Sequence, residues 1–290
     1  MSKLISVGQI IDYSWEEYRN HFFSFLNISG WLLVPTLIGM LALSIAPSVS
    51  VIDSGRDLFF FERAGALLLS VNNFLLAPIV GVWVFINLIR ASFSLLEKKS
   101  FYFKKMAKES WNYFFPIIWI GILVSLLVLI AMLFTVPGLV LNMLGMLFSL
   151  NILSFIGSML IVVGVIAGIV FAIRWIVYYA FAQYILLIEN LHGKKALTHS
   201  RQLVTGKFWP FFIRLIIPKI VFFLIAIVAE SVILYFLDAL IKLSVGLNAE
   251  LEMRLVSLTS ILILSIVTLL INPLIITADI LLYRSLKENV

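Results

Sequence analysis

The chain has 290 residues, of which 62% are hydrophobic and 12% are charged, and its formal net charge is +6. Soluble domains average about 45–50% apolar and about 25% charged residues, so this composition excludes an ordinary soluble domain and indicates a protein embedded in a lipid bilayer. Cysteine is absent, which excludes disulfides, thiolate nucleophiles and cysteine metal sites.

Six stretches are long and apolar enough to cross a bilayer, since a span needs about 20 mostly apolar residues. They cover roughly residues 24–46, 67–89, 115–136, 153–175, 210–237 and 255–278. What remains is too short and too dispersed for an added soluble domain, so we expect a single membrane domain, 1–290. A polar segment precedes the first stretch and no small-residue cleavage site follows it, so we expect the N-terminus to be retained.

Amphipathic segments precede three of these stretches, and each ends at an aromatic pair. The pairs are Phe22-Phe23, Phe114-Phe115 and Phe208-Trp209, at intervals of 92 and 94 residues. Apolar residues recur every three to four positions before each pair, which predicts helices lying in the membrane interface over residues 7–26, 99–118 and 193–212. Ser6 with Gln9 fits a capping box that starts the first of them.

This spacing predicts a threefold internal repeat with units of about 1–97, 98–190 and 191–290. Each unit consists of an interfacial helix, a span, an external loop and a second span. Two spans per unit keep the same orientation, so we expect parallel repeats related by an axis along the membrane normal. The predicted fold class is an all-α integral membrane protein with six transmembrane helices in three parallel repeats. A generic six-span bundle with accidental periodicity is the alternative.

Basic residues are distributed unequally between the two sides of this topology. One side carries thirteen, namely Lys3, Arg19, Lys98, Lys99, Lys104, Lys105, Lys108, Lys194, Lys195, Arg201, Lys207, Arg284 and Lys287. The other side carries four, namely Arg56, Arg63, Lys242 and Arg254. The positive-inside rule therefore places both termini in the cytoplasm. The lysines cluster at span ends, which favours contact with anionic lipid headgroups over nucleic acid.

Charged residues inside the spans are the best candidates for a site, because they are costly in a bilayer and usually face a protein interior or a cavity. The candidate anion- or lipid-binding residues are Arg90, Arg174, Arg214, Lys219 and Asp279. We expect Asp279 to be the counter-charge of Arg214. Arg214 and Lys219 are five positions apart, so they share a cavity only if Pro218 distorts the helix between them. Structural pairing of these charges is the alternative interpretation.

No arrangement typical of a catalytic or metal site is found. The histidines, His21, His192 and His199, lack the carboxylates that would complete a metal site, and no serine lies in a nucleophile motif. We therefore expect no enzyme activity, no metal and no cofactor.

Two segments resemble a known family. Residues 6–26, SVGQIIDYSWEEYRNHFFSFL, and residues 187–215, LIENLHGKKALTHSRQLVTGKFWPFFIRL, are similar to the prokaryotic membrane domain attached to some glycerophosphoryl diester phosphodiesterases and to related YciC-like proteins. The second segment shows the family-like order of Glu189, then Gly193-Lys194, Ala196-Leu197, Ser200-Arg201 and Gly206-x-Phe208-Trp209. The resemblance implies a multi-span protein of a prokaryotic cell membrane. It does not imply phosphodiesterase activity, since the catalytic barrel is missing from this chain.

Two classes of function follow from the sequence. The first is transport or handling of an anionic amphiphile such as a lipid, with the intramembrane cations binding its head. The second is a non-catalytic accessory or scaffold subunit, whose interfacial helices bind anionic lipid or a partner protein. The scarcity of carboxylates deep in the spans argues against coupling to protons or sodium and so weakens the first class.

Overall fold

The structure is a computed structural model, and it describes residues 4–47, 51, 55–99, 102–246 and 248–288. All regular elements in these ranges are helices. Six helical segments are long and apolar enough to cross a membrane, namely Phe22–Ile45, Phe60–Leu96, Phe103–Leu147, Asn151–Glu189, Phe208–Val245 and Ala249–Lys287. The six predicted spans are thereby confirmed, and each predicted stretch falls within one of these longer segments, except that the first ends one residue beyond its segment.

Large apolar side chains cover the outside of these helices. Phe23 and Phe74 are each 81% exposed and Leu243 is 83% exposed. Such surfaces are unfavourable in water but match the hydrocarbon core of a bilayer. The exposed side chains thus agree with a multi-pass membrane protein.

Contacts divide the chain into two compact units. The first unit comprises Met1–Trp111 and Ile213–Asn289, and the second comprises Asn112–Phe212. The helix α13, Phe208–Val245, begins in the second unit and continues in the first. Because each unit is defined by its own internal contacts, the two are described separately. The single domain and the threefold repeat remain predictions.

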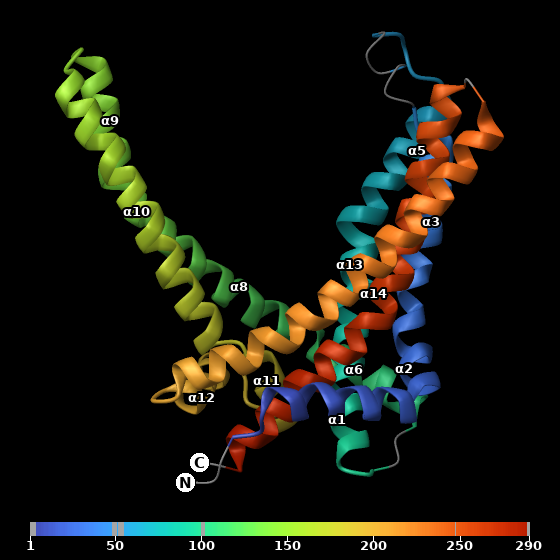
Figure 1. Ribbon diagram of the computed structural model, residues 1–290, viewed down its shortest axis with the longest axis horizontal. Coiled ribbons are helices and arrows are strands. Elements are labelled where there is room, and N and C mark those ends of the chain that lie inside the picture. Colours follow the sequence, from blue (N-terminus) through green and yellow to red (C-terminus); the bar gives the residue numbers. More distant parts are fainter. Residues whose placement is uncertain (1–3, 48–50, 52–54, 100–101, 247, 289–290) are drawn as a thin grey trace. The chain divides into compact units, whose positions relative to one another are not determined.

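The first unit contains helices from both ends of the chain (Figure 1). Its elements are α1 (Val7–Asn20), α2 (Phe22–Ser29), η1 (Gly30–Leu32), α3 (Leu33–Ile45), α5 (Phe60–Val71), η2 (Asn72–Leu76), α6 (Ala77–Leu96), α7 (Phe103–Ser110), the main part of α13, and α14 (Ala249–Lys287). The predicted capping box starts α1, since Gln9 N donates to Ser6 Oγ at 3.2 Å and Ser6 N donates to Gln9 Oε1 at 3.1 Å. Helix α1 packs on α14, and α7 packs on α6.

The core of the first unit lies where α1, α2, the last turns of α6 and the last turns of α14 meet. Ile10, Phe25, Ile89 and Ile280 are each fully buried there. The Tyr18 phenol is also buried, which raises its pKa because burial disfavours the charged form. The N-terminal and C-terminal segments meet at this end, where Ile5 N donates to Ser285 Oγ at 3.0 Å. Both termini therefore lie at the same end of the unit.

Two prolines within the spans, Pro35 and Pro78, coincide with helix irregularities. A 3₁₀ turn, η1, precedes Pro35, and a π-helical segment, η2, precedes Pro78 at the first turn of α6. Proline lacks the N–H that a regular helix needs, so neighbouring turns adjust around it. Pro218 and Pro273 differ, because α13 and α14 run through them as continuous helices.

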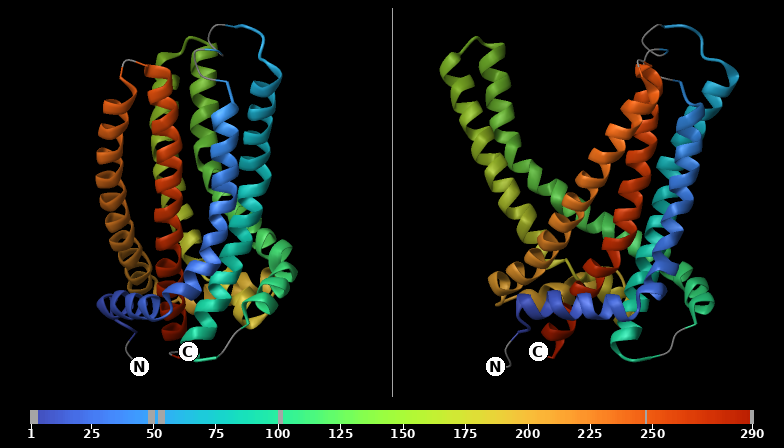
Figure 2. Two further views of the ribbon diagram at one scale, coloured as in Figure 1. Left: turned by 90° about the vertical axis from the view of Figure 1, so that its right-hand side faces the viewer. Right: turned by 45° about the vertical axis from the view of Figure 1, so that its right-hand side comes forward.

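The second unit is built around a helical hairpin. Its elements are α8 (Phe114–Met132), η4 (Leu133–Thr135), α9 (Val136–Leu147), α10 (Asn151–Tyr178), α11 (Ala182–Glu189) and α12 (Lys194–Val204). Figure 2 shows α9 and α10 running side by side. Pro137 lies in the first turn of α9, where its missing N–H would be unpaired in any case.

Glycines bring the two helices of this hairpin, α9 and α10, into backbone contact. A methyl group added to Gly157 would lie 2.6 Å from Asn142 Cα, and one added to Gly145 would lie 2.8 Å from Ser154 Cα. Asn142 Nδ2 also donates to Ser158 Oγ at 2.7 Å. Small residues and polar bridges of this kind stabilise helix pairs in lipid, where hydrophobic burial gives little driving force.

Candidate functional site

Arg90, the first candidate cation, joins α6 to α7. Its Nη2 donates to Glu109 Oε2 at 2.8 Å, and its Nη1 donates to the Met106 carbonyl at 3.2 Å and to Ser110 Oγ at 3.3 Å. The buried Ser110 hydroxyl in turn donates to Asn87 Oδ1 at 2.9 Å. Arg90 therefore has a carboxylate partner and anchors a helix end, so its charge is already balanced.

Lys219 and Asp279 form an ion pair between α13 and α14. Lys219 Nζ lies 2.9 Å from Asp279 Oδ1, and the two side chains are 26% and 9% exposed. The ion pair found here joins Asp279 to Lys219, and the expected pairing of Asp279 with Arg214 stays a prediction. Mutual attraction offsets part of the cost of removing these charges from water.

Arg214 contacts the N-terminal segment. Its Nε donates to the Ile5 carbonyl at 2.7 Å, while the Ile5 amide donates to Ser285 on α14. Residue 5 is thus held between α13 and α14. The residue before Ser285 on α14 is Arg284. Its Nη1 donates to the carbonyl of Leu96, the last residue of α6, at 3.1 Å. Arg284 thus contacts the C-terminal end of α6, where cations commonly bind unpaired carbonyls, whereas Arg214 holds the segment that precedes α1.

Arg174 belongs to the second unit and has different surroundings. It is exposed on α10, its Nε and Nη2 donate to Tyr178 Oη at 3.3 Å, and its guanidinium carbon lies 5.4 Å from the centre of the Tyr178 ring. The Arg201 guanidinium, from α12, lies 5.9 Å from the same ring. Two cations therefore lie within cation–π distance of one aromatic ring. We name Arg174, Tyr178 and Arg201 the arginine–tyrosine cluster.

A buried serine positions Arg201 beside this tyrosine. Ser200 Oγ donates to the Tyr178 carbonyl at 2.8 Å and accepts from the Phe181 amide at 3.2 Å. Tyr178 is the last residue of α10 and Phe181 precedes the start of α11, so both groups lie at helix ends, where backbone groups lack helical partners. Ser200 thereby fixes α12 to the end of α10. Phe208, at the start of α13, completes the surroundings with its ring 5.6 Å from that of Tyr178.

The two arginines of the cluster differ electrostatically from Arg90 and Lys219 of the first unit, each of which forms an ion pair with a carboxylate. Among the described residues, neither Arg174 nor Arg201 forms an ion pair with a carboxylate, and both are exposed. The nearest sequence neighbour with an ion pair is His199, whose Nε2 lies 3.3 Å from Glu189 Oε2. The cluster consequently presents positive charge and a hydroxyl to an external anion.

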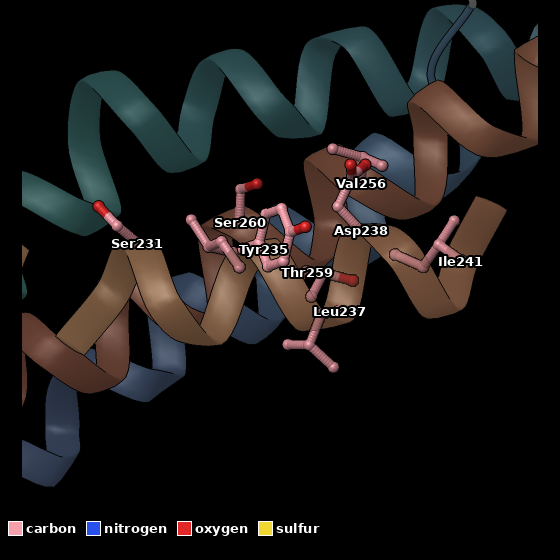
Figure 3. A pocket seen from close by; sticks show the side chains of 9 residues that line it. Ser231, Tyr235, Leu237, Asp238, Ile241, Val256, Thr259 and Ser260 are labelled. Carbon is pink, nitrogen blue, oxygen red and sulfur yellow. The ribbon is translucent and has the colours of Figure 1, made fainter. Parts of the chain in front are cut away.

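A pocket of about 300 Å³ lies between α13 and α14 (Figure 3). Hydroxyl side chains, aliphatic side chains and Asp238 line it. Asp238 is already paired with Lys242 Nζ at 2.7 Å, so this pocket offers no unbalanced charge. In the described ranges of the chain, no group of three or more histidine or carboxylate side chains could hold a metal ion.

The structure distributes the five sequence candidates over several places. Lys219 and Asp279 are together, Arg90 is paired elsewhere with Glu109, Arg214 contacts Ile5, and Arg174 lies in the second unit. Sequence reasoning missed Arg201, which it assigned only to the basic side, and Ser200 as its anchor. The shared tyrosine could not be foreseen, because it depends on how α12 turns back onto α10.

Arg254 is a second residue that sequence reasoning missed. Its guanidinium donates to the carbonyls of Leu43, Ser44 and Ala46, the last at 3.2 Å. These are the unpaired carbonyls at the end of α3. Arg254 therefore caps α3 from α14.

Comparisons with protein-family models, with curated proteins and with solved structures found no match to this chain. The resemblance noted in the sequence therefore stays a prediction.

Proposed function

We propose that this protein binds and handles an anionic amphiphile, such as an anionic phospholipid, through the arginine–tyrosine cluster. The observation that carries this proposal is the pair of exposed guanidinium groups around Tyr178, neither of which has a carboxylate partner among the described residues. Arginine forks suit phosphate oxygens, and the aromatic rings beside them suit the boundary between headgroups and acyl chains. The substrate would be held rather than chemically changed, so we infer no enzyme activity.

The proposal places the cluster at the cytoplasmic face of a prokaryotic cell membrane. Arg174 lies near the end of α10, Trp175 and Tyr178 follow it, and the lysine-rich α12 comes next. Aromatic belts and basic segments are typical of this boundary, and anionic lipids concentrate in the cytoplasmic leaflet. Both termini would lie on the same side.

We further infer the three parallel repeats with their interfacial helices. In the first unit α7 packs on α6 and α1 packs on α14, while in the second α12 packs on α11. In each case the interfacial helix of one predicted repeat packs on the second span of the preceding repeat. The third repeat counts as the one that precedes the first. A ring of equivalent units would produce this pattern. Trp15, Trp111 and Trp209 are each at least half exposed, as headgroup-depth anchors would be.

The scaffold function has its own support. In the first unit Arg90, Lys219 and Arg214 all join one helix to another segment, and none of them lines a pocket described above. A protein that only holds lipid or a partner would need these ties and no path for a substrate. Movement of the bound amphiphile distinguishes the two candidates.

A binding titration tests the anionic site. Purified full-length protein in mild detergent would be titrated calorimetrically with short-chain phosphatidic acid and, separately, with phosphatidylcholine of the same chains. We expect phosphatidic acid to bind more tightly, and Arg174→Gln or Arg201→Gln to weaken it by about tenfold or more, because each removes a charge-assisted hydrogen bond worth about 1.5–3 kcal/mol.

Arg63→Gln is the matched control, since Arg63 is an exposed arginine whose side chain is 64% accessible and which lies in the first unit. It should leave the titration unchanged. Equal binding of the two lipids, or equal affinity in all three variants, would exclude the anionic site and leave the scaffold function.

A further inference from the structure

A polar pocket lies among the spans of the first unit, where a lipid-facing protein would be expected to have only apolar side chains. It has a volume of about 430 Å³ and is lined by residues from η1, α3, α5, η2, α6 and α14. This volume falls within the range of about 300–1,000 Å³ that is typical of small-molecule sites. Leu32, Leu69 and Leu264 line its apolar walls, and no charged side chain lines it.

Asn72 gives this pocket an unsatisfied hydrogen-bond acceptor. Its side chain is 4% exposed, and its Oδ1 has no hydrogen-bond partner in the described part of the chain. Asn72 Nδ2 donates to Asn73 Oδ1 at 3.3 Å, so the amide nitrogen has a hydrogen-bond partner. A buried amide oxygen without a donor costs roughly 1–3 kcal/mol, so the site favours any occupant that brings an O–H or N–H.

The backbone around Asn72 is arranged to admit this side chain. Asn72 begins the π-helical segment η2, and π segments within helices often mark functional sites. Across from it on α3, a methyl group at Gly39 would lie 2.9 Å from Asn72 Nδ2, so only glycine leaves the amide in place. The close approach thus fixes the amide between the two helices.

Thr268 adds a donor on the opposite helix. It lines the same pocket from α14, and within the described ranges its hydroxyl forms no hydrogen bond. A ligand that fits both groups donates to Asn72 Oδ1 and accepts from Thr268 Oγ1. It is uncharged, because no ion lines the pocket to balance a charge, and it carries apolar chains, because the walls are apolar.

We propose that this pocket binds the head of an uncharged, hydroxyl-bearing lipid of the diacylglycerol class, with its free hydroxyl on Asn72 and an ester carbonyl on Thr268. The site is separate from the arginine–tyrosine cluster and does not depend on the function proposed for it. A single water molecule would also donate to Asn72 Oδ1. The pocket is much larger than one water molecule, however, and its leucine walls offer no hydrogen bonds to further waters.

Photo-crosslinking tests this assignment. Full-length protein would be reconstituted into nanodiscs of phosphatidylcholine containing a diacylglycerol analogue with a diazirine near the glycerol, and labelled peptides would be identified by mass spectrometry. We expect saturable labelling of peptides from α3, from the junction of η2 and α6, and from α14. Unlabelled diacylglycerol should compete, and phosphatidic acid with the same chains should compete much less.

The variants separate the hydrogen bonds from the shape of the pocket. Asn72→Leu keeps the side-chain shape but removes the acceptor, and it should reduce the apparent affinity about fivefold. Thr268→Val does the same for the donor and covers the case in which Asn72→Leu fails to fold. Ser70→Ala, on the exposed face of α5, is the control and should bind as the wild type does.

Three outcomes would overturn the proposal. Labelling that does not saturate would indicate nonspecific contact with the bilayer and no binding in the pocket. Equal competition by phosphatidic acid would show that the head need not be uncharged. Labelling that is unchanged in both Asn72→Leu and Thr268→Val would show that neither polar group recognises the ligand.

Discussion

Replacing Gly157 with alanine should destabilise the protein, although alanine normally favours a helix. The added methyl group would lie 2.6 Å from Asn142 Cα and still closer to Asn142 N, whereas ordinary contact begins at 3.4 Å, so α9 and α10 must separate by at least about 0.8 Å. Overpacking of this kind costs about 1–3 kcal/mol. The gain in helix propensity is about 1 kcal/mol, which leaves a net loss of up to about 2 kcal/mol.

Gly121→Ala is the matched control, because Gly121 lies inside α8 of the same unit and its added methyl group would meet nothing closer than Gln183 Nε2 at 3.7 Å. There the propensity gain of about 1 kcal/mol should appear alone. Thermal unfolding in mild detergent would compare the two variants with the wild type. At about 2–4 °C per kcal/mol, the Gly157 variant should melt several degrees below the Gly121 variant. Equal or reversed midpoints would refute the close packing of the hairpin.

Three further predictions concern the first unit. Lys219→Met and Asp279→Leu should each cost up to about 3–5 kcal/mol by removing one partner of the ion pair, and the double variant should recover much of that loss in a thermal-unfolding cycle, whereas strict additivity would argue against the ion pair. Arg254→Gln should speed amide hydrogen exchange at the end of α3 by uncapping it, and unchanged exchange would show that the cap contributes nothing. Because the native chain lacks cysteine, Arg56→Cys should react with an impermeant external reagent while Lys287→Cys should not, and the opposite result would reverse the predicted orientation.

The six spans and the capping box of α1 were predictable because they depend on local patterns. Twenty apolar residues, or a serine three positions before a glutamine, carry the same meaning wherever they occur. The third span extends further than its predicted end at residue 136, because α9 continues to Leu147 and Pro137 lies in its first turn, where proline is tolerated.

The candidate site was less predictable because its chemistry depends on pairing between distant segments. The sequence indicated that Lys219 and Asp279 lie within spans, but not that these residues, 60 positions apart, have Nζ and Oδ1 atoms 2.9 Å from each other. It likewise singled out Arg174 without Arg201. A glycine spacing of seven, as in Gly138 with Gly145 and Gly157 with Gly164, was a signal of the α9–α10 hairpin that could have been used.

Native mass spectrometry of the protein extracted from its own membranes tests the central claim most directly. The account predicts that anionic phospholipid stays bound through gradual removal of detergent, that zwitterionic phospholipid is lost first, and that the double variant Arg174→Gln/Arg201→Gln loses both together. An unchanged set of bound lipids in the double variant would contradict the assignment of the arginine–tyrosine cluster as the anionic site.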